Sequence, residues 1–182
     1  MTKGDKLFGI KTVYKGIEMR SKLETKVAMF LDALGIEWQY EPKRFLLSNG
    51  TTYIPDFYLP KHDMWLEVKG LIGKHNELIS EKFVEENNTE LIMFSSIEMR
   101  WFSTKDYVNE LCKDRDIQIG KCGECKNIFF CSNLGSYYCR CCGYHDGDHD
   151  IFGKMNSFGL VEIDFSDIES IKRWLNENKV RI

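Results

Sequence analysis

The sequence lacks the features of membrane proteins and of disulfide-stabilised secreted proteins. It contains no run of 18 or more apolar residues, so we expect no transmembrane helix. Residues 1–16 hold no apolar segment of the kind that a signal peptide needs, so we expect no secretion. Six of the seven cysteines lie between positions 122 and 142 in closely spaced pairs, which is typical of a metal site in a reducing compartment. These absences favour a cytoplasmic protein.

The sequence also lacks internal repeats and low-complexity segments. Its 182 residues suffice for one domain, or for a core with a small module. The apolar share of 43% and the aromatic share of 13% argue against disorder. We expect a core with a basic N-terminal arm over residues 1–118 and a zinc-ribbon-like module over 119–150. Residues 151–182 are expected to form a strand and a helix that pack on one of the two.

The net charge of −3 is unusual for a protein that binds nucleic acid, but the charges are unevenly distributed. Residues 1–26 contain seven Lys or Arg against three acids, whereas residues 76–120 contain five against ten. A basic arm on an acidic body can steer a polyanion to one face. The candidate DNA-binding residues are Lys11, Lys15, Arg20, Lys22 and Lys74. The alternative is a solvated and partly frayed N-terminus.

The order of apolar patterns predicts an α/β core with a mixed sheet. Ser21 and Glu24 form a capping box at the start of a helix, and Gly35 is a suitable stop at its end. Strands are expected over 36–47, 51–60, 64–70, 91–95 and 160–165, and helices over 75–88, 104–116 and 166–178. The SNGT segment between the first two strands favours a two-residue type I′ hairpin turn.

Two carboxylates and a lysine are predicted to meet at one end of this sheet. Side chains two residues apart on a strand share a face, so Glu67 and Lys69 point the same way while Val68 is turned away. Pro55 donates no backbone hydrogen bond and bends the chain, which brings Asp56 beside Glu67. Two close carboxylates repel each other unless a cation bridges them, and a hard divalent cation suits their oxygens. Such a site is suited to hydrolysis of nucleic acid.

A purely structural role is the alternative for each of these residues. Strands often end in charged side chains, and Glu-x-Lys is a common pattern. The presence of Pro-Asp eleven residues before the Glu, and of the acidic Glu24 on an amphipathic helix, favours catalysis. For Glu24, the alternative is that it serves only as the partner of Ser21 in the capping box.

These motifs resemble those of the PD-(D/E)XK nucleases, and within that superfamily they are similar to the phage endonuclease I family of junction-resolving enzymes. The resemblance covers roughly residues 14–96, through RSKLETKVAMFLDALGIEWQYE, YIPDFYLP, LEVKGLI and, weakly, LIMFSS. It implies a restriction-endonuclease-like fold. It also implies metal-site carboxylates at Glu24, Asp56 and Glu67, and a catalytic lysine at Lys69. The implied metal is Mg²⁺ or Mn²⁺, the products carry 5′-phosphate and 3′-hydroxyl ends, and a dimer recognises branched DNA by shape.

Two features depart from that family. There, a longer connection into the Pro-Asp strand helps to build an intertwined dimer, whereas the SNGT segment favours a local hairpin and puts strand exchange in doubt. The family also lacks the cysteine-rich segment, so the resemblance leaves that part of the chain unexplained.

The cysteine-rich segment has the spacing of a zinc ribbon, with two Cys-x₂-Cys pairs separated by 13 residues. The expected ligands of a structural zinc ion are Cys122, Cys125, Cys139 and Cys142. Thiolates favour zinc over magnesium. Cys131 and Cys141 compete as ligands, and Cys112 is expected in the core. His145 and His149 could bind metal, although a solvated loop is the preferred interpretation.

The aromatic side chains near the cysteines allow two interpretations. Phe129, Phe130, Tyr137 and Tyr138 could stack on unpaired bases or form the small core of the ribbon itself, which is preferred. The ribbon could accordingly be a scaffold, a DNA-contacting finger or a surface that docks another protein.

The leading hypothesis is a phage-type, Mg²⁺-dependent endonuclease that acts on branched DNA as the homodimer that the resemblance implies, in the cytoplasm of a bacterial host and with no membrane partner. One alternative is a nuclease of the same fold with another substrate, such as a mismatch nickase, a restriction-like or transposon end-cutting subunit, or an RNase. The other is a non-catalytic zinc-ribbon adaptor that binds nucleic acid. The presence of all four candidate catalytic residues argues against the adaptor.

Overall fold

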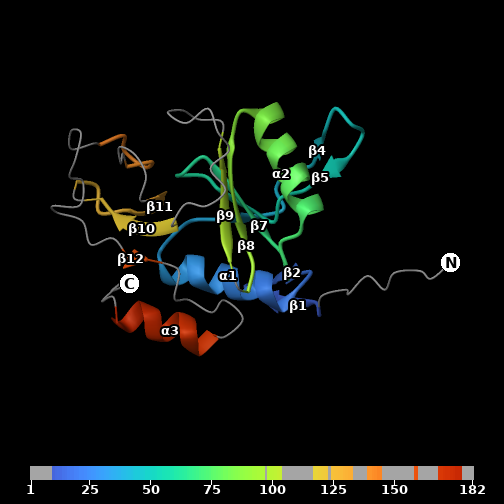
Figure 1. Ribbon diagram of the computed structural model, residues 1–182. Coiled ribbons are helices and arrows are strands. Elements are labelled where there is room, and N and C mark those ends of the chain that lie inside the picture. The colour runs from blue at the N-terminus through green and yellow to red at the C-terminus, as the bar shows by residue number, and fades with distance from the viewer. Residues whose placement is uncertain are drawn as a thin grey trace.

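The computed structural model describes residues 10–96, 98–103, 117–122, 124–132, 139–144, 158–159 and 168–177 (Figure 1). Its largest sheet has five strands in the order β3-β6-β7-β8-β9. These strands are β3 (Gln39–Tyr40), β6 (Phe57–Leu59), β7 (Met64–Val68), β8 (Glu90–Phe94) and β9 (Met99–Ser103). Because β7 and β8 run parallel and the other neighbours run antiparallel, the expected mixed sheet is confirmed. None of the described helices is long and apolar enough to cross a membrane.

Helices cover both faces of this sheet. The central strand β7 is buried along its whole length, and its side chains alternate between two apolar clusters. Leu66 and Val68 belong to the cluster that contains Phe30 of α1 (Lys22–Ala33). Trp65 belongs to the opposite cluster, with Phe83 of α2 (Lys74–Asn87). The core is therefore a three-layer α/β/α arrangement.

The ends of α1 follow the sequence signals. Ser21 is the N-cap, and its hydroxyl accepts a hydrogen bond of 3.1 Å from the backbone N–H of Glu24. Gly35 has a φ of 66°, and its N–H donates to the Asp32 carbonyl while the N–H of Ile36 donates to Leu31. This pair of bonds is a Schellman motif, which satisfies the last carbonyls of the helix. The expected start and stop of this helix are confirmed.

A hairpin precedes α1 that the sequence analysis did not identify. It consists of β1 (Thr12–Tyr14) and β2 (Ile17–Met19), which pair antiparallel. Lys15 and Gly16 connect them, with φ values of 49° and 79°, as a type I′ turn requires. The Tyr14 hydroxyl donates a 2.8 Å hydrogen bond to the Asp32 carboxylate on α1. Residues 10–19 are therefore an ordered hairpin attached to the core.

The segment from 36 to 60 differs from the expectation in two ways. The expected strand over 36–47 is divided into β3, which pairs with β6, and β4 (Phe45–Leu46), which pairs with β5 (Thr52–Tyr53). Glu41, with a φ of 43°, lies at this break. The predicted two-residue type I′ turn is wrong, because the Gly50 N–H donates to the Leu47 carbonyl and Asn49 does not have a positive φ. The loop has three residues, closed by a glycine at positive φ.

A second, three-stranded sheet carries the cysteines. It has the order β11-β10-β12, formed by β10 (Ile117–Lys121), β11 (Ile128–Ser132) and β12 (Phe158–Gly159). Ile117 and Ile119 of β10 belong to the same apolar cluster as α1, so this sheet shares the core of the larger one. The helix expected in the tail is present as α3 (Ile168–Glu177), which lies beside α1 (Figure 1).

Several expectations fall outside the described residues. They are the helix over 104–116 with Cys112, the strand over 160–165, and the side chains of Cys131, Tyr137, Tyr138, His145 and His149.

Candidate active site and metal centre

The pairing of β6 with β7 brings Asp56 opposite Glu67. Phe57 is paired with Leu66, so the next residues outward along the two antiparallel strands are Asp56 and Glu67. Both side chains are buried, with 5% and 3% exposed. The Asp56 carboxylate accepts a 2.6 Å hydrogen bond from the backbone N–H of Val68. The predicted proximity of the two carboxylates is therefore present in the structure.

Lys69 joins them from the same strand face. Its ammonium forms an ion pair with Oε1 of Glu67, whereas Val68 packs into the apolar cluster on the other face of the sheet. Oε2 of Glu67 is buried and has no hydrogen-bond partner. A buried carboxylate oxygen without a partner is costly, and a cation could satisfy it.

The surroundings of this group disfavour negative charge. Burial raises the pKa of Asp56 well above its usual value, and the charge of Glu67 raises it further. Burial likewise raises the pKa of Glu67, against the lowering effect of Lys69. Burial lowers the pKa of Lys69, but the charges of Glu67 and Asp56 outweigh it, so the net pKa is raised. Lys69 therefore carries a positive charge at neutral pH, and it faces two carboxyl groups that repel each other.

Glu24 reaches this region from the first turn of α1 while it also serves the helix cap. Its Oε1 accepts a 2.7 Å hydrogen bond from the Ser21 hydroxyl, and its Oε2 accepts bonds from the Arg20 N–H and the Tyr40 hydroxyl at 2.9 and 2.6 Å. Its charge contributes to the raised pKa of Asp56. The capping role of Glu24 is therefore confirmed, and its role at a metal site stays a prediction.

Two tyrosines border the acidic group, and the sequence analysis assigned neither of them. Burial and the hydrogen bond to Glu24 raise the pKa of Tyr40. Burial and the charge of Glu67 raise the pKa of Tyr53, whose hydroxyl lies 3.3 Å from Ser80 on α2. Their only sequence signal was a place in aromatic strands, which a core position explains equally well.

The acidic group contains ligands of the kind that a divalent cation prefers. Mg²⁺ is commonly held by one or two carboxylates together with water and phosphate oxygens. Asp56 and Glu67 provide two such carboxylates, and Oε2 of Glu67 is available. In the described part of the chain, these carboxylates with Glu24 do not form a group as compact as the cysteine cluster below.

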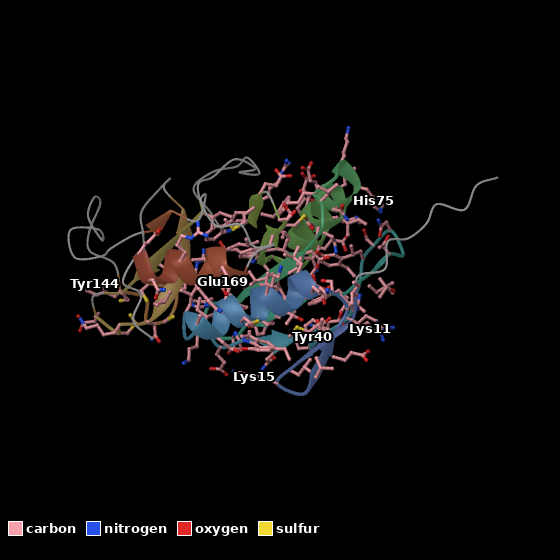
Figure 2. The ribbon with its side chains drawn as sticks, turned by 90° about the horizontal axis from the view of Figure 1, so that it is seen from below. Lys11, Lys15, Tyr40, His75, Tyr144 and Glu169 are labelled. Atoms are coloured by element: carbon pink, nitrogen blue, oxygen red, sulfur yellow. The ribbon has the colours of Figure 1, made fainter. Side chains whose placement is uncertain are left out.

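The candidate DNA-binding residues form two sets. Lys11 pairs with Glu18 at 2.6 Å and Lys15 with Asp32 at 2.8 Å; both are exposed on the β1–β2 hairpin (Figure 2). Arg20 pairs with Glu41, and this hydrogen bond and charge, with a smaller contribution from Asp56, raise its pKa against the effect of burial. Lys22 and Lys74, at the first residues of α1 and α2, are exposed.

The four cysteines form a compact metal-ligand cluster. Their sulfur atoms all lie within 4.8 Å of one another, with 3.8 Å between Cys122 and Cys142 and 3.6 Å between Cys125 and Cys139. Four thiolates about 2.3 Å from a tetrahedral zinc ion lie about 3.8 Å apart. These distances exceed the roughly 2.05 Å of a disulfide. The cluster that the spacing predicted therefore has the dimensions of a zinc site.

The backbone forms the same turn around each cysteine pair. The carbonyl of the first cysteine accepts from the residue four positions later, Lys126 or Gly143, and both of these have positive φ. In addition, Asn127 donates a 3.3 Å hydrogen bond to the sulfur of Cys125. Burial raises the pKa of this thiol, but the bonds from Asn127 outweigh it and lower the pKa to about 6. These two turns, called here the first knuckle (residues 122–126) and the second knuckle (residues 139–143), thus hold the sulfur atoms in place. The lowered pKa favours the thiolate form of Cys125.

The second knuckle is docked on the larger sheet through Arg140. Its guanidinium binds the carboxylate of Glu90 at the start of β8, with one contact of 3.0 Å, and lies 5.1 Å from the centre of the Trp101 ring. His62, in the β6–β7 turn, contacts the Ile128 carbonyl of β11 at 2.9 Å. Phe129 packs with Cys122 and Cys139 in the core of the ribbon, as expected, whereas Phe130 belongs to the main core beside Phe94 of β8. The cysteine module is therefore attached to the larger sheet at the start of β8, at β9 and at the β6–β7 turn.

Comparison with known proteins agrees with the motifs. No family model and no solved structure matches the chain. The chain is 31% identical over 119 residues to the protein named Endonuclease I from Escherichia phage T7. The match covers 61% of this chain and 78% of that protein. On the strength of this match, the chain belongs to the endonuclease I family.

Proposed function

We propose that the protein is a metal-dependent DNA endonuclease of the PD-(D/E)XK type, with Asp56, Glu67 and Lys69 as its catalytic residues. The observation that carries the proposal is the meeting of two buried carboxyl groups and a charged lysine at one end of the β6–β7 pair. The similarity to a phage endonuclease supports it. Glu24 completes the acidic group from α1.

A bound Mg²⁺ or Mn²⁺ would activate water and neutralise charge on the phosphate. Asp56 and Glu67 would hold it, since their mutual repulsion and the unpartnered oxygen of Glu67 both favour a cation. The ammonium of Lys69 would orient the attacking water or stabilise the anionic transition state. The Val68 N–H fixes one oxygen of Asp56, so this carboxylate is already oriented before substrate arrives.

We propose branched DNA as the substrate, on the basis of the motif resemblance to junction-resolving enzymes. Arg20 lies near the acidic group and would contact the cleaved phosphate. Lys22 and Lys74 are exposed at helix starts, where backbone N–H groups add to their attraction for phosphate. Two copies would cut two strands of one junction. The local β4–β5 hairpin favours a dimer without strand exchange.

The test is cleavage of labelled DNA by Asp56→Asn, Glu67→Gln and Lys69→Met variants in Mg²⁺. Each should reduce the cleavage rate by roughly a hundredfold or more while DNA binding in EDTA stays within a few-fold of wild type. Lys61→Met is the matched control, because Lys61 is exposed and pairs with Glu37 at 3.8 Å, away from the acidic group. If the Asp56→Asn or Lys69→Met variant cleaves at the wild-type rate, the assigned roles are refuted.

A further inference from the structure

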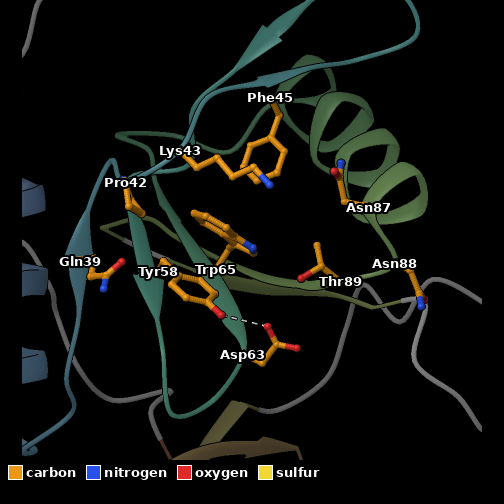
Figure 3. Close-up of a pocket in the computed structure, with 10 residues that line it drawn as sticks. All are labelled: Gln39, Pro42, Lys43, Phe45, Tyr58, Asp63, Trp65, Asn87, Asn88 and Thr89. Atoms are coloured by element: carbon orange, nitrogen blue, oxygen red, sulfur yellow. Dashed lines mark hydrogen bonds between the residues drawn. The ribbon is translucent and has the colours of Figure 1, made fainter.

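A pocket lies on the α2 face of the sheet, beside the β6–β7 hairpin (Figure 3). Its volume is about 430 Å³, which is within the range of small-ligand sites. The residues that line it are Gln39, Pro42, Lys43, Phe45, Tyr58, Asp63, Trp65, Asn87, Asn88 and Thr89. Aromatic rings, amide and hydroxyl groups, and one lysine therefore surround a single hollow.

The aromatic part of the pocket is a fixed pair of rings. Tyr58 and Trp65 lie opposite each other on β6 and β7, with ring centres 4.6 Å apart. A 3.1 Å hydrogen bond from the Tyr58 hydroxyl to Asp63 holds the tyrosine in place. Phe45 packs edge-on against Trp65. Trp65 and Phe45 are buried, so the half-buried Tyr58 ring that they support is the surface on which a nucleobase can stack, with a contribution of about 1–3 kcal/mol per base.

The polar part of the pocket complements a nucleotide. Lys43 extends from the segment between β3 and β4 toward the rings, and its ammonium lies 4.7 Å from the centre of the Phe45 ring (Figure 3). Asn87 and Thr89, from the opposite wall, present an amide and a hydroxyl. The amide and hydroxyl can bind the edge of a base, and the lysine can bind a phosphate.

The pocket lies on the same sheet face as the proposed catalytic residues. Trp65 and Glu67 are two residues apart on β7, so their side chains share a face about 7 Å apart. Tyr53 links the two regions, because it packs in the cluster of Trp65 and Phe45 while the charges of Glu67 and Asp56 raise its pKa. A strand that places one phosphate at Glu67 has a neighbouring nucleotide within reach of the pocket.

We infer that this pocket binds an unpaired nucleotide of the DNA substrate, next to the phosphodiester that is cut. This inference rests on the proposed function, and it gives a physical basis for selecting distorted DNA. Only DNA with a base outside the helical stack can fill the pocket, and leaving a stacked helix costs a few kcal/mol unless the DNA is already branched or mismatched.

The test uses branched DNA in EDTA, with the fluorescent base 2-aminopurine placed in turn at each position within three nucleotides of the cut. With wild-type protein, one position should lose fluorescence several-fold through stacking on the rings. Tyr58→Phe should keep this loss because it keeps the ring. Tyr58→Leu and Lys43→Ala should abolish it, whereas Lys61→Ala, a matched exposed lysine outside the pocket, should not.

Cleavage of the same DNA by wild-type protein in Mg²⁺ separates this inference from the proposed function. If cleavage occurs but no position depends on both Tyr58 and Lys43, the pocket assignment is overturned. If wild type does not cleave, the proposed function fails, while a position-specific signal that depends on both residues still supports the pocket. Thermal melts confirm that each variant is folded.

Discussion

At the scale of single residues, Asp56 is placed where its negative charge is unfavourable. It is buried beside Glu67, and both burial and that neighbouring charge raise its pKa well above 3.8. A carboxyl group whose pKa is raised on folding stabilises the folded state most below its unfolded pKa. This stabilisation is lost as the pH rises through the folded value. At neutral pH the site therefore reduces the stability of the metal-free protein.

We predict that Asp56→Asn stabilises the metal-free protein. The amide oxygen can still accept from the Val68 N–H, and the buried charge is gone. In EDTA at pH 8 the variant should melt above wild type, by about 2–4 °C for each kcal/mol gained. The difference should shrink toward pH 5, and Mg²⁺ should raise the Tm of wild type only. Melting scans at both pH values test this, and a variant that melts below wild type at pH 8 would contradict it.

His62 predicts a second dependence on pH, with the opposite sign. Burial lowers its pKa to about 4, and the charge of Arg140 adds to this against the raising effect of its bond to Ile128. Because the folded pKa lies below the unfolded value of 6.5, stability is fully present above pH 6.5 and is lost as the pH falls toward 4.

The expected loss between pH 7 and 4 is about 3 kcal/mol, which a His62→Gln variant should not show. Urea unfolding at pH 7, 5.5 and 4.5 measures it. The glutamine amide can still donate to the Ile128 carbonyl, so subtracting the two curves removes the contribution of all other titrating groups. Parallel curves for the two proteins would show that His62 is not the cause.

At the scale of elements, the second cysteine knuckle is tied to β8 through a buried ion pair. Glu90 is 3% exposed, and its carboxylate accepts a 2.9 Å hydrogen bond from the Ser103 hydroxyl in addition to its contact with Arg140. Removing one partner of such a pair leaves a buried charge unpaired, which costs about 3–5 kcal/mol.

We therefore predict that Glu90→Gln lowers the free energy of unfolding by several kcal/mol, and that adding Arg140→Met recovers part of the loss. Glu98→Gln is the control. Glu98 pairs with Arg100 at 2.9 Å on β9, but its side chain is 35% exposed, so the change should be under about 1 kcal/mol. Chelation of zinc should lower the Tm of wild type more than that of the double variant. Equal losses for Glu90→Gln and Glu98→Gln would exclude a docking role for Arg140.

How far the sequence predicted these elements depends on how local their causes are. The helix boundaries at Ser21 and Gly35 were predictable because each signal and its partners lie within a few residues. The β1–β2 hairpin was missed because a lysine, Lys15, takes a positive φ that its residue type rarely adopts. In the SNGT segment, Asn-Gly marked a turn correctly but did not determine its length.

Contacts between distant segments were less predictable. Asp56 and Glu67 could be paired from the sequence because they lie on consecutive antiparallel strands. The contact of Arg140 with Glu90 spans 50 residues and has no periodic signature. The pocket is likewise formed by four separate segments, so neither feature could be read from a pattern.

At the scale of the whole molecule, the proposed DNA contacts come from the β1–β2 hairpin and the starts of α1 and α2. Lys22 and Lys74 are exposed, whereas Lys11, Lys15 and Arg20 already pair with carboxylates. Binding of DNA should weaken steeply with salt, because each phosphate contact releases counterions. We predict that Lys22→Ala and Lys74→Ala each reduce the slope of log K against log salt by about 1. Lys172→Ala, an exposed lysine on α3, is the control, and an unchanged slope in both variants would contradict the contacts.

The central claim is that the acidic group around Asp56 and Glu67 hydrolyses branched DNA with the help of a divalent cation. The most direct measurement is a cleavage panel of linear duplex, nicked duplex, mismatched duplex, single strand and four-way junction, with and without Mg²⁺. The account predicts Mg²⁺-dependent cuts at the branch point of the junction, fast in wild type and absent in Asp56→Asn. Cleavage in EDTA, or no cleavage of any substrate by folded, zinc-loaded protein, would contradict it.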